Sequence, residues 1–170
     1  MPQPSREPLR SESAVQHVIE ILIDSQEGLV TVGERLQDHT LKRYFLAESL
    51  KRAEYIGQLE TALRQRGVSR FHGRGSAAAA VHRTWARVKS RFVGGDHTLL
   101  VTAEQGEEAV AEIYSKAMET YLPRAIHQIL TAQSAHIRLV HAYVKAARDR
   151  VPSVGKAAQN MLPVREVISR

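Results

Sequence analysis

The chain has 170 residues, a net charge of +6, 43% hydrophobic and 25% charged residues, a composition typical of a single soluble domain rather than a disordered chain. It contains no cysteine, which excludes disulfides, thiolate metal sites and cysteine nucleophiles. Its longest apolar runs are far shorter than a bilayer span, and its N-terminus lacks the apolar centre of a secretory signal. We therefore expect a cytoplasmic protein with no membrane span.

The first half of the chain predicts two long amphipathic helices. Apolar residues recur at helical spacing over residues 12–37 and again over residues 40–66. Ser11 or Ser13 is the expected N-cap of the first helix, and Gly67 the expected end of the second. The short connection between them predicts an antiparallel pair. Residues 1–11 are assigned to an N-terminal tail.

A basic crossover follows the second helix. Residues 61–95 contain no acidic residue, and the alanine-rich stretch at 76–92 predicts a shorter helix. Arg83, Arg87 and Arg91 fall at i, i+4 and i+8, which places them on one stripe of that helix. Such a stripe could bind an anion, including nucleic acid or an anionic membrane surface, or its arginines could pair with acidic helices of the same chain.

The second half predicts another pair of long helices. Asp96 is the expected N-cap of a helix over 96–120, and Pro123 suits the first turn of a helix that continues to Arg150. Residues 151–170 form a C-terminal tail. Two helical hairpins joined by one long connection predict an all-α, ferritin-like four-helix bundle over 12–150, with a short extra helix in the crossover between helices two and three.

Several local motifs resemble an uncharacterised family of bacterial four-helix-bundle proteins in the ferritin-like group. The resemblance covers roughly Ser13 to Arg148, and its most specific part joins a Gly-Gly-Asp cap to a Glu-x-Gly-Glu sequence. It implies the bundle fold and an unassigned biochemical role. The motifs that carry it are "DSQEGL", "HRTWARVKS", "GGDHTLLVTAEQGEEA" and "AQSAHIRL".

Proteins of the ferritin-like group often hold two metal ions between their helices, ligated by glutamates and by Glu-x-x-His pairs. The second helix here places Lys51 at the expected glutamate and Glu54 at the expected histidine, and the fourth has Gln133 three residues before His136. The pattern is therefore degenerate. The candidate ligands for iron or manganese are Glu27, Glu54, Glu104, Glu107 and His136.

A metal-free polar core is the alternative interpretation. If Lys51 points inward, its ammonium could neutralise Glu27 and Glu104 where a metal would otherwise lie. In the third helix, Glu104 and Glu107 are expected to face inward, whereas Glu108 and Glu112 are expected to face solvent. A single weak metal site made by His136, Glu54 and Glu104 is a further possibility.

These features leave three functional hypotheses, and none assigns a catalytic residue. The first is a binding or self-associating bundle with a degenerate metal site, which acts as a homo-oligomer or with a protein partner. The second is a diiron or dimanganese protein that handles iron, oxygen or peroxide, with Tyr114 near the metals. The third is a basic module that binds anions or nucleic acid through Arg83, Arg87 and Arg91.

Overall fold

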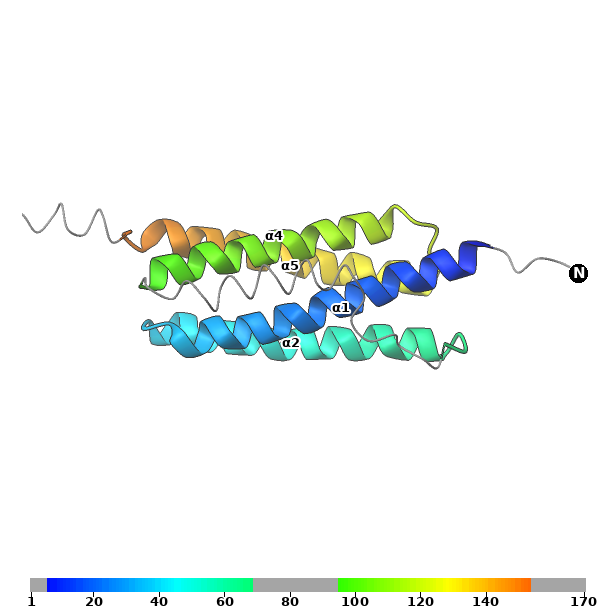
Figure 1. The fold of residues 1–170 in the computed structure, drawn as a ribbon, viewed down its shortest axis with the longest axis horizontal. Coiled ribbons are helices and arrows are strands. Elements are labelled where there is room, and N and C mark those ends of the chain that lie inside the picture. The colour runs from blue at the N-terminus through cyan, green and yellow to red at the C-terminus, as the bar shows by residue number, and fades with distance from the viewer. Residues whose placement is uncertain (1–5, 69–94, 154–170) are drawn as a thin grey trace, which may run out of the picture.

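The computed structural model describes residues 6–68 and 95–153, and these ranges form four long helices and no strand (Figure 1). The all-α four-helix bundle predicted from the sequence is confirmed. The short helix predicted over 76–92 lies outside the described residues. No helix within the described ranges is long and apolar enough to cross a membrane. The helices are α1 (Arg6–Arg35), α2 (His39–Arg64), α4 (Asp96–Met118) and α5 (Arg124–Arg150).

Each helix packs against two antiparallel neighbours. α1 lies beside α2 and α4, and α5 completes the square by lying beside the same two helices. The start of α4 contacts the α1–α2 turn, which places the N-termini of α2 and α4 at one end of the bundle. The connection from α2 to α4 therefore joins opposite ends. The α2–α5 pair is the least closely packed of the four.

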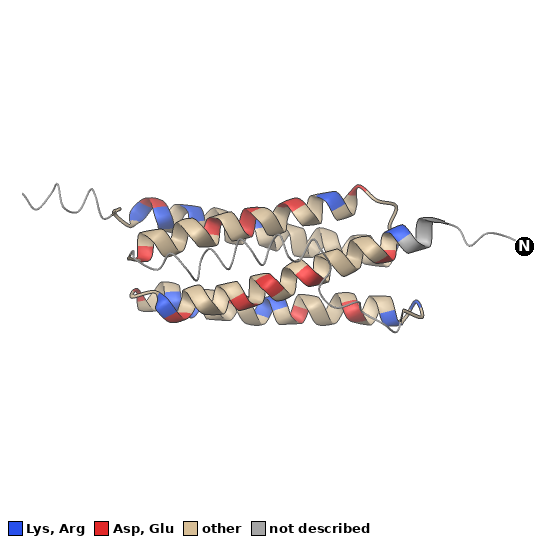
Figure 2. Cartoon of the chain, in the orientation of Figure 1, with Lys and Arg blue, Asp and Glu red and all other residues tan. Residues whose placement is uncertain are grey.

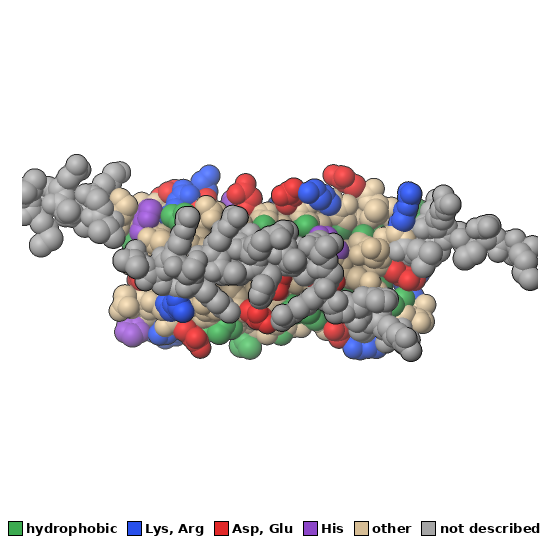
Figure 3. All heavy atoms as spheres, viewed as in Figure 1, with side chains coloured by type: hydrophobic (Ala, Val, Ile, Leu, Met, Phe, Trp, Pro, Cys, Tyr) green, Lys and Arg blue, Asp and Glu red, His purple; other side chains and the backbone are tan. Residues whose placement is uncertain are grey.

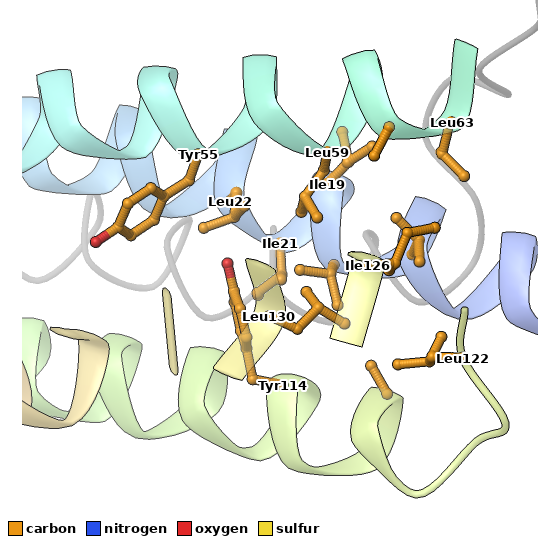
Figure 4. Packing of buried hydrophobic residues seen from close by; sticks show 14 of the residues in the cluster. Ile19, Ile21, Leu22, Tyr55, Leu59, Leu63, Tyr114, Leu122, Ile126 and Leu130 are labelled. Atoms are coloured by element: carbon orange, nitrogen blue, oxygen red, sulfur yellow. The ribbon is translucent and has the colours of Figure 1, made fainter. Parts of the chain in front are cut away.

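The apolar core is divided into two clusters along the bundle. One contains Leu22, Leu59 and Leu130, together with Tyr55 and Tyr114, whose side chains come from α2 and α4 (Figure 4). The other lies toward the α1–α2 turn and includes Phe45, Leu100 and Val144. Polar side chains occupy the interior between these clusters. Because burying a polar group without a partner is costly, this polar layer must satisfy itself within the bundle.

Two predicted helix starts differ from the structure. The N-cap predicted at Ser11 or Ser13 is wrong, because α1 begins at Arg6 and Ser11 is buried inside the helix. Asp96 is the first residue of α4 rather than its N-cap, which is Gly95. Pro123 immediately precedes α5, and its carbonyl accepts the hydrogen bond of the His127 N–H.

The end of α2 has the geometry that the sequence predicted at Gly67. The Val68 N–H bonds to the Leu63 carbonyl and the Gly67 N–H to the Arg64 carbonyl, the two bonds of a Schellman motif. Gly67 has a φ of 83°, a left-handed conformation that favours glycine because it has no Cβ. Val68 then packs against the same apolar cluster as Leu63. The motif fixes where the chain leaves the helix.

The carboxylate of Asp96 ties the second hairpin to the first. Oδ1 accepts a hydrogen bond from the Gln37 N–H at 2.8 Å, and Oδ2 accepts one from the Asp38 N–H at 3.0 Å. Asp38 in turn caps α2, since its Oδ1 accepts from the Thr40 and Leu41 N–H groups. One acidic side chain thus holds the α1–α2 turn against the start of α4.

Replacement of Asp96 by alanine should lower the free energy of unfolding by about 1–2 kcal/mol, because two backbone N–H groups lose a charged acceptor at a solvent-exposed site. Asp96→Asn retains one acceptor oxygen and should lose about half as much. Urea denaturation measures both. Equal stability of the alanine variant and the wild type would show that water replaces the carboxylate without loss.

Candidate functional site

The centre of the bundle is occupied by a buried ion pair between α2 and α4. The side chain of Arg52 has no exposed surface, and its Nη2 donates to Glu107 Oε2 at 2.5 Å. Glu107 is also fully buried. The guanidinium Nε donates to Ser25 Oγ of α1 at 3.3 Å, and that hydroxyl lies 3.5 Å from Glu107 Oε1. Three helices thus meet at one charged contact.

Helical spacing places Arg52 in this position. It lies seven residues after Phe45 and seven before Leu59, and both of these side chains are fully buried. Positions seven apart lie on nearly the same side of a helix, so the side chain at 52 must also point inward. Its guanidinium always carries a positive charge and therefore needs a negative partner in the interior. Glu107 supplies that partner.

Arg52, Glu107 and Ser25 form a buried polar cluster, and Glu48 and His136 extend it toward the α2–α5 side. Glu48 lies one turn before Arg52, and its Oε2 is 3.7 Å from Arg52 Nη1. The same oxygen is 2.9 Å from His136 Nε2 of α5, whose side chain is 34% exposed. The ring of His136 meets that of Tyr55 edge to face at a centroid distance of 5.9 Å. The cluster therefore reaches solvent on this side through the imidazole.

The cluster contains two carboxylates and one guanidinium. A protonated His136 would balance the second carboxylate, Glu48, whereas a neutral imidazole would leave one net negative charge. Burial raises the pKa of Glu107 above its usual value, and the adjacent guanidinium of Arg52 opposes that rise. Among the described residues, Arg52 Nη1 has no hydrogen-bond acceptor within reach. Its nearest compensation is the Glu48 carboxylate.

A second polar network lies beside the ion pair and is built around Gln133 of α5. The Tyr114 hydroxyl donates to Gln133 Oε1 at 2.7 Å, and Gln133 Nε2 donates to Gln58 Oε1 at 2.8 Å and to the Tyr55 carbonyl at 3.3 Å. Figure 4 shows Tyr114 reaching from α4 into the interior with its hydroxyl directed away from its own helix. Burial raises the pKa of the Tyr114 hydroxyl. The phenol therefore acts as a neutral donor.

The five predicted metal ligands do not converge on one site. Glu107 and His136 both belong to the cluster around Arg52, but Glu27 and Glu54 are exposed. Glu104 is partly buried and forms an ion pair with Arg148 of α5. As expected, Glu107 faces inward and Glu108 and Glu112 face solvent, whereas Glu104, also expected to face inward, is only partly buried. Within the described ranges, no group of three or more potential ligands could hold a metal ion.

The alternative in which Lys51 points inward and neutralises Glu27 and Glu104 is not observed. Its Nζ lies at the surface, 2.7 Å from Glu54 Oε2, and this hydrogen bond raises the lysine pKa. The adjacent residue, Arg52, supplies the internal positive charge instead. The sequence contains the signal for it, because Phe45, Arg52 and Leu59 repeat at intervals of seven. Arg83, Arg87 and Arg91, the predicted anion-binding residues, lie outside the described residues.

Acidic residues outnumber basic ones along two of the helices. α4 carries five acidic side chains and a single basic one, Lys116. Figure 2 shows Asp and Glu recurring along both α1 and α4, with Lys and Arg mainly toward the helix ends. Apart from Glu107 and the partly buried Glu104, the glutamates of α4 form a solvated face.

Replacement of Arg52 by methionine should lower the free energy of unfolding by about 3–5 kcal/mol, because Glu107 remains buried without its cation. The double variant Arg52→Met/Glu107→Leu should be more stable than Arg52→Met alone, since it removes the unpaired charge. Chemical denaturation of the wild type, both single variants and the double variant gives the coupling free energy. Simple additivity of the two substitutions would contradict a coupled ion pair.

Replacement of Tyr114 by phenylalanine should cost about 1–2 kcal/mol, because Gln133 Oε1 loses its buried donor. Tyr121→Phe is the matched control, since Tyr121 is 78% exposed. The control should change stability by less than about 0.5 kcal/mol. Thermal or urea unfolding measures both variants. Equal effects at the two positions would contradict a structural role for the Tyr114 hydroxyl.

No curated protein matches the sequence of this chain. The family described as "Domain of unknown function (DUF2383)" matches residues 11–120, a range that contains most of α1, all of α2 and α4, and the residues Ser25, Arg52 and Glu107. The match spans well over half of the chain. The protein therefore belongs to this DUF2383 family of unknown function.

Proposed function

We propose that the protein is a non-enzymatic helical bundle that acts by self-association or by binding a protein partner, with a degenerate metal site between its helices. The observation that supports this function is the buried guanidinium of Arg52, paired with Glu107 at the centre of the bundle. A permanently protonated guanidinium has no lone pair for a metal and fills the space between the helices with positive charge. Function is then carried by the outer surface.

The proposal also includes a cytoplasmic location in bacteria and membership of the ferritin-like group. Antiparallel neighbours with a long connection between α2 and α4 are compatible with that group, whose bundles have one long crossover. A shared helix order supports common architecture only, because one fold can host many functions.

A diiron or dimanganese protein is the second candidate, and the contact between Glu48 and His136 favours it. A carboxylate and an imidazole 2.9 Å apart, with the carboxylate of Glu107 nearby, are suitable donors for iron or manganese. Metal binding would require Arg52 to leave the centre and Glu27, Glu54 or Glu104 to turn inward. Both movements break ion pairs or expose buried charge, which is why we place this function second.

Metal analysis separates the two candidates. We expect protein purified without chelator and then incubated with Fe²⁺ to retain well under one metal ion per chain after desalting, with no change in Glu107→Gln. About two ions per chain, reduced by Glu107→Gln and by His136→Ala, would instead support the second candidate. Circular dichroism of each variant confirms that the comparison is made between folded proteins.

Solution mass tests the preferred function directly. Light scattering should give a mass at least twice that of the 19.0 kDa chain, or affinity purification should recover a stoichiometric protein partner. A monomer with neither property would contradict the proposal. Salt-sensitive retention on heparin that is lost when Arg83, Arg87 and Arg91 are replaced by glutamine would favour the anion-binding alternative instead.

A further inference from the structure

One side of the bundle carries an apolar strip that the core does not use. On α2 the strip consists of Leu46, Leu50, Ala53 and Gly57, spaced at i, i+4, i+7 and i+11, so that they share one side of the helix. Leu50 is 71% exposed, Ala53 and Gly57 are exposed, and Leu46 is partly buried. Figure 3 shows hydrophobic side chains along the edge of the molecule over α2.

The adjacent helix extends the strip. Gly33 of α1 lies against Leu46, and Ser25 contacts Arg52, so α1 and α2 run past each other in opposite directions. Ile23 and Val30 of α1 are therefore level with the strip. Ile23 is 38% exposed and Val30 is partly exposed. We define the apolar face as these residues of the two helices, namely Leu46, Leu50, Ala53, Gly57, Ile23 and Val30.

The order of large and small side chains makes this face complementary to itself. A two-fold axis perpendicular to α2, passing between Lys51 and Arg52, would place Leu46 opposite Gly57 of a second copy of the chain and Leu50 opposite Ala53 of that copy. Each large side chain then faces a small one. The same register brings Arg43 level with Glu60 of the second copy, whose carboxylate already accepts from Arg64 of its own chain, so that residues of opposite charge lie at each end of the contact.

Gly57 provides room for the opposing leucine. A Cβ added at Gly57 would have no atom within 4 Å, so nothing within this chain requires a glycine there. The residue also lies at the edge of a shallow hollow that α2 forms with Ile129 of α5. The absence of a side chain at Gly57 leaves room for a side chain of a second helix.

We propose that this apolar face is the contact surface of a symmetric homodimer in which the α2 helices of two copies pack antiparallel. An isologous interface requires a face that is complementary to itself under a two-fold rotation, and the Leu-Leu-Ala-Gly order meets that requirement. The inference rests on the proposed function, since it specifies a second copy of this chain as the partner.

Surface substitutions with a matched control test which face forms the dimer. Leu50→Lys should weaken dimerisation at least tenfold, measured by sedimentation equilibrium. Leu139→Lys on α5 removes an equally exposed leucine, at 69% exposure, and should leave the dimer unchanged. A dimer that is insensitive to Leu50→Lys but lost in Leu139→Lys would overturn this interface while leaving self-association intact.

Cysteine cross-linking tests the register, and the wild-type chain contributes no background because it has no cysteine. A mixture of Leu46→Cys and Gly57→Cys chains should form disulfide-linked heterodimers, and neither variant alone should form homodimers efficiently. Homodimers of each variant alone would indicate parallel helices and overturn the proposed axis. A monomeric wild type would overturn the homodimer, and the proposed function would then stand only if a different protein partner is recovered.

Discussion

A guanidinium without access to water requires a carboxylate beside it, and the contact between Arg52 and Glu107 meets that requirement at the centre of the bundle. The requirement is stringent because arginine cannot release its proton to become neutral. Displacement of α4 along α2 by one turn would separate the two charges while both remain buried. The ion pair therefore selects one register of these helices, whereas apolar contacts alone would accept several.

The other polar contacts act at different heights along the same bundle. Asp96 joins the start of α4 to the α1–α2 turn at one end, and Gln133 joins α5 to α2 and α4 beside the ion pair. Tyr44 of α2 and Tyr143 of α5 pack against each other toward the same end of the bundle as Asp96, with their ring centroids 4.0 Å apart. Helices that pack loosely, as α2 and α5 do, are thus connected mainly by directional contacts.

Periodicity in the sequence predicted the helices and the inward direction of Glu107, because both depend only on spacing along one helix. The buried position of Arg52 depends in addition on which side of α2 faces the core. Lys51 and Arg52 are neighbours about 100° apart around the helix, and alignment to a metal-binding pattern selected Lys51. The buried neighbours Phe45 and Leu59 favour residue 52. The pairing of Glu104 with Arg148 depends on how α4 and α5 align, which no pattern within one helix contains.

The side of α2 that faces the core also determines which of its residues face solvent. Once Phe45, Arg52 and Leu59 face the core, Leu50 must face solvent, because it lies nearly opposite to them around α2. Leu50 is 71% exposed, so its side chain contributes little to the core. Together with Ala53 and Gly57, Leu50 lies on the face that we propose as the contact between two α2 helices. The internal charge and the external apolar face are therefore two consequences of one orientation of α2.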